Sequence, residues 1–119
     1  EIRFCDWSSD VCSSDLHLDH ARYKFYAYVR PQTLKSGWSR DRILAAITEK
    51  GIPCFSGSCP EIYRERAFDG TGWAPPQRLP VARELGETSL MFMVHPTLSL
   101  EFLHETCDVV SDVLAEALA

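Results

Sequence analysis

The chain has 119 residues, of which 45% are hydrophobic, 24% charged and 11% aromatic, and its formal net charge is −5. This length supports one small domain. No run of 18 apolar residues occurs, which argues against a membrane-spanning helix. The 12 basic residues are outnumbered by 17 acidic ones and form no cluster, which argues against a nucleic-acid partner.

The opening segment, EIRFCDWSSDVCSSDL, has no helical or strand period and lacks the apolar core of a secretory signal. Residues 6–16 back-translate codon for codon to a common sequencing-adapter strand. We therefore expect residues 1–16 to be a non-native, disordered leader and residues 17–119 to be the domain. A natural disordered leader is the alternative.

The cysteine count bears on the compartment. Outside the leader an odd number of cysteines remains, so they cannot all pair within the chain. This pattern predicts a reducing, cytoplasmic location. The three are Cys54, Cys59 and Cys107.

The first half of the domain predicts a strand and a helix. Residues 23–30 are rich in aromatic and β-branched side chains and separate with period two into two faces, which favours a strand. One face holds Tyr23, Phe25, Ala27 and Val29, and the other holds Lys24, Tyr26, Tyr28 and Arg30. Residues 35–38 form a loop. Ser39 can cap a helix that carries Ile43, Leu44 and Ile47 on one face, and Gly51 suits the position after its end.

The second half predicts shorter elements. Residues 52–55 are extended, residues 61–66 make a turn or two of helix, and residues 69–77, with two Gly and two Pro, are irregular. Residues 79–85 predict a short helix, and the apolar run of residues 89–94 predicts a buried strand.

Ser99 opens the last predicted helix, whose apolar stripe includes Cys107 and so places that thiol in the core. We expect His104, on the same helix, to be exposed or half-exposed. The fold class is α+β, with a small three-stranded antiparallel or mixed sheet covered by helices. The remaining stripe positions are Leu103, Val110, Val113, Leu114 and Ala117.

No catalytic centre emerges from composition or spacing. Nucleophile-elbow, phosphate-loop and dinucleotide motifs are absent, and no lysine stands in a pattern typical of a Schiff base. His95 ends a predicted strand, where a site and a structural role both remain open. A metal site built from His17, His20, Cys54 and Cys59 is a further hypothesis, although Cys54 and Cys59 lack CxxC spacing.

From Tyr23 onward the chain resembles the C-terminal small domain of DegT/StrS-type sugar aminotransferases. The resemblance lies in an order of features: YKFYAYVRP, then EKGIP, then CFSGSCPEIYRERAF, then LPVAREL, then LMFMVHPTL before the last helix. The last two segments are its most specific part. They are similar to the family's "LPVAExL" helix and its "LSLPxHPxLT" strand and turn.

The resemblance implies the C-terminal domain of a fold-type I, pyridoxal-phosphate enzyme. Its parent would transfer an amino group, from glutamate, to a keto group of a nucleotide-linked sugar, and would be a homodimer. The Schiff-base lysine and the phosphate-binding residues would lie in an N-terminal large domain that this chain lacks. The fragment alone would then be inactive and would not bind the cofactor.

The same resemblance implies a set of substrate-contacting residues on the segment after the second strand. Aromatic rings would supply apolar or stacking surface, hydroxyls would supply hydrogen bonds, and a guanidinium would meet a phosphate or carboxylate. These residues are Phe55, Ser56, Ser58, Tyr63 and Arg64. A stand-alone α+β ligand-binding or regulatory module is the alternative function.

Overall fold

The computed structural model describes residues 24–57 and 59–119. The predicted leader, His17, His20, Tyr23 and Ser58 lie outside the described residues. The elements in chain order are β1 (Lys24–Tyr28), η2 (Pro31–Thr33), α2 (Arg40–Glu49), β2 (Cys54–Phe55), η3 (Ile62–Arg64), η4 (Arg66–Phe68), α3 (Pro80–Thr88), β3 (Ser89–Met93) and α4 (Leu100–Ala117).

The three strands form one antiparallel sheet in the order β1-β3-β2, so the apolar strand β3 is central, as its composition predicts. Phe25 lies opposite Phe92, and Ala27 lies opposite Leu90. Because side chains alternate along a strand, these four residues share one face of the sheet.

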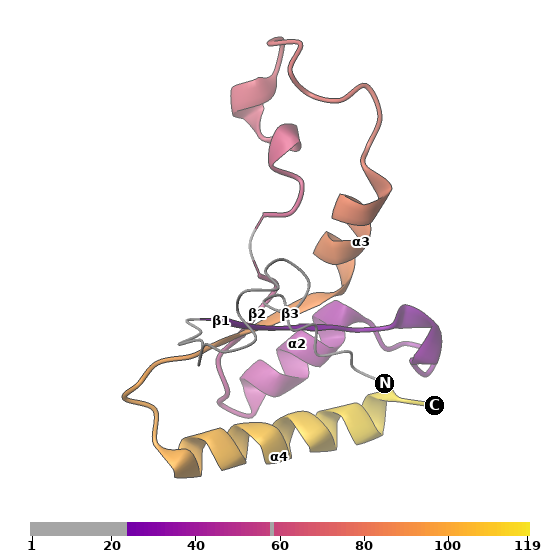
Figure 1. Cartoon of the computed structure of the whole chain (residues 1–119). Helices are drawn as coiled ribbons and strands as arrows, with labels where there is room; N and C mark the ends of the chain where they lie inside the picture. The colour runs from indigo at the N-terminus through magenta and orange to yellow at the C-terminus, as the bar shows by residue number, and fades with distance from the viewer. Residues whose placement is uncertain (1–23, 58) are drawn as a thin grey trace, which may run out of the picture.

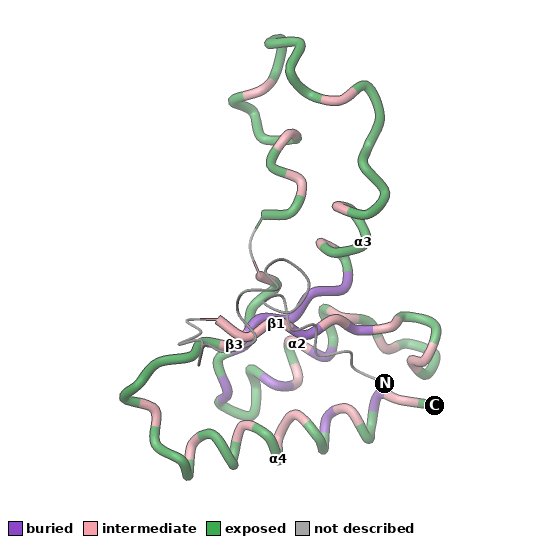
Figure 2. Tube along the Cα trace, in the orientation of Figure 1, coloured by how far each residue is buried: buried purple, intermediate pink, exposed green. Residues whose placement is uncertain are grey.

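Helices α2 and α4 pack beside each other under that face (Figure 1), and the buried residues gather between the helices and the sheet (Figure 2). The largest fully buried side chains come from all three components: Ile43 and Ile47 from α2, Leu90 from β3 and Val113 from α4. Full burial of a side chain of this size contributes about 1.5–3 kcal/mol. The predicted α+β class is confirmed.

The helix boundaries follow capping chemistry. The hydroxyl of Ser39 accepts a hydrogen bond from the backbone N–H of Arg42, and the hydroxyl of Ser99 accepts one from that of Phe102. Gly51 follows α2 with φ of 89°, a conformation that favours glycine. Both predicted N-caps and the predicted end of α2 are confirmed.

Helix α4 corrects the predicted apolar stripe, because Cys107 is exposed and Leu103 is 40% exposed. In the first half of the helix the row that faces the core runs one residue earlier than predicted, and the polar Thr106 interrupts its apolar pattern. In the second half the prediction is confirmed, because Val113 and Ala117 are buried and Val110 and Leu114 pack against the core. The Thr106 hydroxyl donates to the carbonyl of Phe102, 2.8 Å away, which satisfies it within the helix. The core-facing row is Phe102, Thr106, Val109, Val113 and Ala117.

Helix α3 is longer than predicted and passes into β3 with no residue between them, because Thr88 ends the helix and Ser89 begins the strand. Gly86, a poor helix former, hides this extension in the sequence. None of the helices in the described part of the chain is long and apolar enough to cross a membrane.

The central strand generates a stability prediction. Leu90→Ala removes a side chain with no exposed surface, so we expect the free energy of unfolding to fall by about 2–5 kcal/mol. Leu100→Ala, at a residue that is 73% exposed, is the control and changes it little. Urea denaturation followed by circular dichroism measures both. Equal effects would contradict the assigned core.

Candidate functional site

Residues 59–79, which we call the arm, rise from the sheet beside α3 and return at the start of that helix (Figure 1). The arm carries η3 and η4, and its surface is largely exposed (Figure 2). None of residues 59–87 is buried. The polypeptide therefore leaves its core here and presents side chains to its surroundings.

The residues just before the arm, 55–57, which we call its root, are fixed against the sheet. The hydroxyl of Ser89 donates to the backbone carbonyl of Ser56. Gly57 has φ of 92°, and a Cβ at this position would stand 2.8 Å from the ring of Tyr26. Glycine is therefore required twice over, by the backbone conformation and by the close approach to the ring.

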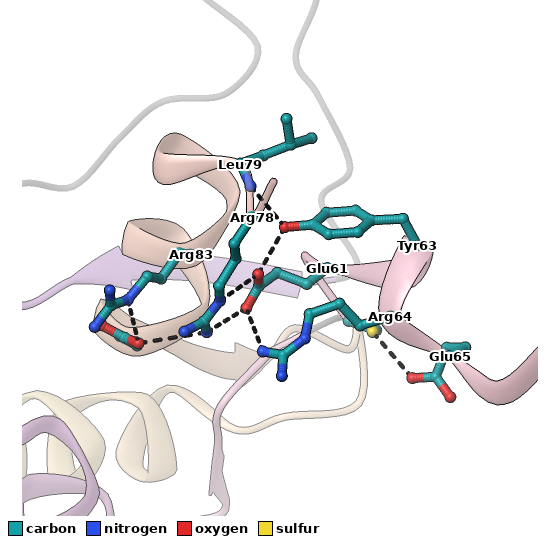
Figure 3. A network of polar contacts seen from close by, with 9 residues as sticks. Glu61, Tyr63, Arg64, Glu65, Arg78, Leu79 and Arg83 are labelled. Atoms are coloured by element: carbon teal, nitrogen blue, oxygen red, sulfur yellow. Dashed lines mark hydrogen bonds and ion pairs between the residues drawn. The ribbon is translucent and has the colours of Figure 1, made fainter. Parts of the chain in front are cut away.

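A network of polar side chains joins the arm to α3 (Figure 3); we call Glu61, Tyr63 and Arg78 the clamp. The guanidinium of Arg78 donates to both carboxylate oxygens of Glu61, at 2.7 and 2.5 Å. The Tyr63 hydroxyl donates to Glu61, at 2.7 Å, and accepts from the backbone N–H of Leu79, at 2.9 Å. The bidentate geometry is the strongest form of an arginine–carboxylate pair.

Glu87 extends this network onto α3. Its carboxylate lies 3.4 Å from the Arg78 guanidinium and accepts a hydrogen bond from Arg83 at 2.8 Å. Arg78 therefore lies between two carboxylates, one from the arm and one from the helix. Ion pairs of alternating sign thus connect Glu61, beside η3, to α3, and no apolar core of described residues lies between them.

The titration of the clamp reflects these contacts. The hydrogen bond from Arg78, followed by that from Tyr63, lowers the pKa of Glu61 from 4.5 to about 2. The hydrogen bond to Glu61 raises the pKa of Arg78. Partial burial, and then the same carboxylate, raise the pKa of Tyr63. At neutral pH the clamp thus contains one carboxylate, one guanidinium and a neutral phenol.

A tight contact also joins the base of the arm to α3. A Cβ at Gly86 would stand 2.6 Å from the side-chain Cγ of Pro60. The absence of a side chain at Gly86 lets the arm lie directly on the helix. The helical glycine that obscures α3 in the sequence therefore has a packing reason.

The predicted substrate-contacting residues fall in two places. Phe55, which is 47% exposed, and the exposed Ser56 lie at the root, while Tyr63 and Arg64 lie farther along the arm in η3. Ser58 lies outside the described residues. The Tyr63 hydroxyl is engaged in the clamp, whereas the Arg64 side chain is 57% exposed and only 3.7 Å from Glu61.

Sequence reasoning missed Glu61 and Arg78 as a pair. They are separated by 17 residues and by an irregular segment, so no helical or strand period relates them. A bidentate arginine–carboxylate pair across a loop leaves no local signal in one sequence. Only the folded arm brings them together.

The other candidate groups have structural surroundings. Burial raises the pKa of Cys54 to about 11, which keeps it a thiol, and the exposed Cys59 thiol contacts Glu65 at 3.4 Å. His95 is exposed, and its Nδ1 accepts a hydrogen bond from the backbone N–H of Thr97. His104 is exposed, as predicted.

The proposed metal site has no support within the described residues, where no group of three or more His, Cys, Asp or Glu side chains could hold a metal ion. The two histidines of that hypothesis, His17 and His20, lie outside this part of the chain.

Solved structures similar to this chain are aminotransferases. The aminotransferase from Psychrobacter cryohalolentis is 53% identical, with a TM-score of 0.76, over 78% of this chain and 24% of its own. A DegT DnrJ EryC1 StrS aminotransferase from Brucella abortus is 20% identical, with a TM-score of 0.57, over 75% of this chain and 21% of its own.

A third structure, 3-amino-5-hydroxybenzoic acid synthase, is 21% identical, with a TM-score of 0.57, over 80% of this chain and 26% of its own. At this identity, it and the Brucella structure show a shared fold. No model of a known protein family matches the sequence, and no curated protein does.

The shared fold, together with 53% identity to one of these structures over 78% of this chain, makes the chain similar to one part of an aminotransferase. Its structural neighbours are of the DegT/DnrJ/EryC1/StrS type, which confirms the resemblance that the sequence indicates. The chain spans about a quarter of the length of these structures.

The clamp generates a pH prediction. Because the pKa of Glu61 is lower in the folded chain than its ordinary 4.5, the clamp's contribution is complete above about pH 4.5 and is lost as the pH falls through about 2. The Leu79 amide, bound to Tyr63, should report this in NMR spectra with a midpoint near pH 2. Glu61→Gln should abolish that titration. A midpoint near 4.5 would contradict the clamp.

Proposed function

We propose that the chain is the C-terminal small domain of a pyridoxal-phosphate aminotransferase that moves an amino group, from glutamate, to a keto group of a nucleotide-linked sugar. One observation carries the proposal: 53% identity to an aminotransferase over 78% of this chain. Residues 17–119 would form the domain and residues 1–16 the non-native leader. The fragment alone is inactive on this proposal.

The cofactor would be held elsewhere in the parent enzyme, because the lysines of this chain do not fit it. Lys35 donates to the backbone carbonyl of Glu116 near the end of α4, at 3.0 Å, and the exposed Lys50 follows the end of α2. Lys24 lies in β1 and has its own partner. None of the three lies on the arm, which carries the proposed substrate residues Tyr63 and Arg64.

The surface that contacts the substrate would be formed by the root and by η3 of the arm. Phe55 offers an exposed ring, Ser56 a hydroxyl, and Arg64 a guanidinium suited to a phosphate or carboxylate. Ser58 and the ring of Tyr63 complete the proposed set. The exposure of Arg64 supports its role, since its ion pair with Glu61 is long, at 3.7 Å, and leaves 57% of its side chain accessible.

The partners would be the absent large domain and a second subunit of a homodimer. Apolar side chains stand exposed along the arm and α3, and such surface is typical of an interface. The neighbours' chains are about four times as long as the matched segment, which leaves ample length for a covering domain. The exposed residues are Ile62, Trp73, Leu79, Val81 and Leu85.

This interface generates a prediction for the isolated chain. Because the exposed apolar side chains lack their cover, we expect concentration-dependent association in sedimentation velocity. A variant with Trp73→Ser and Val81→Ser, at residues 81% and 66% exposed, should associate less. The matched control is Glu101→Gln, on the outer side of α4. A chain that stays monomeric at all concentrations would contradict the proposed interface.

The function is tested in the parent enzyme. Genomic DNA upstream of the His17 codon should continue the reading frame into a domain with a cofactor lysine. The encoded protein should transfer the amino group of glutamate to a nucleotide-linked keto sugar. Arg64→Ala should raise KM for that substrate about 10- to 100-fold through loss of charge-assisted hydrogen bonds.

Glu65→Gln is the control for Arg64→Ala, because Glu65 neighbours it in the arm and contacts the Cys59 thiol. A stand-alone frame, or a parent without aminotransferase activity, would overturn the proposal. Tight binding of a small ligand by residues 17–119 alone would favour the alternative of a stand-alone ligand-binding module.

A further inference from the structure

The arm is ordered without a core of its own. None of residues 59–79 is buried, yet this stretch contains two 3-10 turns and leads directly into the helix α3. Fixing a backbone costs about 1–2 kcal/mol per residue in conformational entropy, and burial normally offsets that cost. Some other interaction must hold the arm in one position.

The clamp is that interaction, because it is the point where residues far apart in sequence meet along the arm. Glu61, on the outgoing limb, accepts both donors of Arg78, on the returning limb. Tyr63 closes a second bridge between the same limbs through the backbone N–H of Leu79. The returning limb continues directly into α3, so both bridges fix the outgoing limb relative to that helix.

Two further contacts give the arm a fixed orientation on the sheet. Pro60 lies against Gly86 of α3, and the Ser56 carbonyl accepts from Ser89 at the start of β3. The arm is therefore attached at its root, at its base and at the clamp.

We propose that Glu61 and Arg78 are positioning residues, which hold the arm as a preformed strut and thereby fix the ring of Tyr63 and the guanidinium of Arg64 for the ligand. This rests on the proposed function for the ligand itself. The arm then meets its ligand without a closing motion. Arg78 neutralises Glu61, so the more exposed Arg64 keeps its charge for an anionic group.

The roles of Tyr63 and Arg64 separate on this basis. The Tyr63 hydroxyl donates once and accepts once within the clamp, so the ring is the part left for contact. Arg64 lies 3.7 Å from Glu61, beyond hydrogen-bond distance, and more than half of its side chain is exposed. Anion recognition therefore falls to Arg64.

The strut is tested first in the present chain by amide hydrogen exchange. Arg78→Gln removes the bidentate donor, and we expect the Leu79 and Arg64 amides to exchange at least 10-fold faster. The β3 amides should keep their rates, which shows that the fold is intact. Glu65→Gln, on the same arm but outside the clamp, is the control. Unchanged exchange at Leu79 would overturn the strut.

A second variant disturbs the contact between the arm and α3 and leaves the clamp residues unchanged. Gly86→Ala should push Pro60 from the helix and speed the same arm amides, and the added Pro60→Ala should restore them. Loss of protection throughout β3 would instead show that the arm is not a separate unit, and would overturn the strut as well.

The positioning role is tested in the parent enzyme. Arg78→Gln should raise KM for the keto substrate several-fold with kcat little changed, and Arg78→Lys should recover part of the loss. An unchanged KM, with arm exchange accelerated, would overturn the positioning role. A parent that is no aminotransferase would instead refute the proposed function and leave the exchange result standing.

Discussion

The direct passage of α3 into β3 is the constraint on which the rest of the structure depends. β3 is paired on both sides and carries the buried Leu90, so its direction is fixed by the sheet. Because no residue separates Thr88 from Ser89, the direction of β3 also constrains the direction of α3. The arm in turn is held against α3 by Pro60 and the clamp. The positions of Tyr63 and Arg64, the proposed substrate residues on η3, therefore depend on the position of the central strand β3.

The molecule therefore uses two kinds of stabilisation in two places. Under the sheet, α2, α4 and the strands bury aliphatic side chains such as Ile43 and Val113. Between the arm and α3, ion pairs among the alternating charges of Glu61, Arg78 and Glu87 provide the stabilisation instead. Charged pairs at a partly exposed surface are individually weak, but a bidentate arginine that also reaches a second carboxylate holds a defined geometry. Such a segment keeps its shape while its apolar side chains stay available.

The sequence predicts the elements well where the signal is local. Period two predicts β1, hydroxyl caps mark the starts of α2 and α4, and the apolar run predicts β3. The prediction fails where a polar residue is satisfied within its own helix, as Thr106 is, because the apparent stripe then shifts onto Cys107. It also ends α3 too early at Gly86, whose packing partner Pro60 lies far away in the sequence. The clamp was unpredictable for the same reason: contacts across a loop follow no period.

The tip of the arm differs from its base. Gly70 and Gly72 both have positive φ, and a Cβ at either would meet nothing within 4 Å. Trp73 beside them is 81% exposed. Residues 70–73 form the bend at the tip, and the clamp lies nearer the sheet than this bend (Figure 1). The length of the bend therefore does not affect the contacts among Glu61, Tyr63 and Arg78. Residues can be added or removed there, or a fluorescent reporter attached, while the supporting architecture remains as it is.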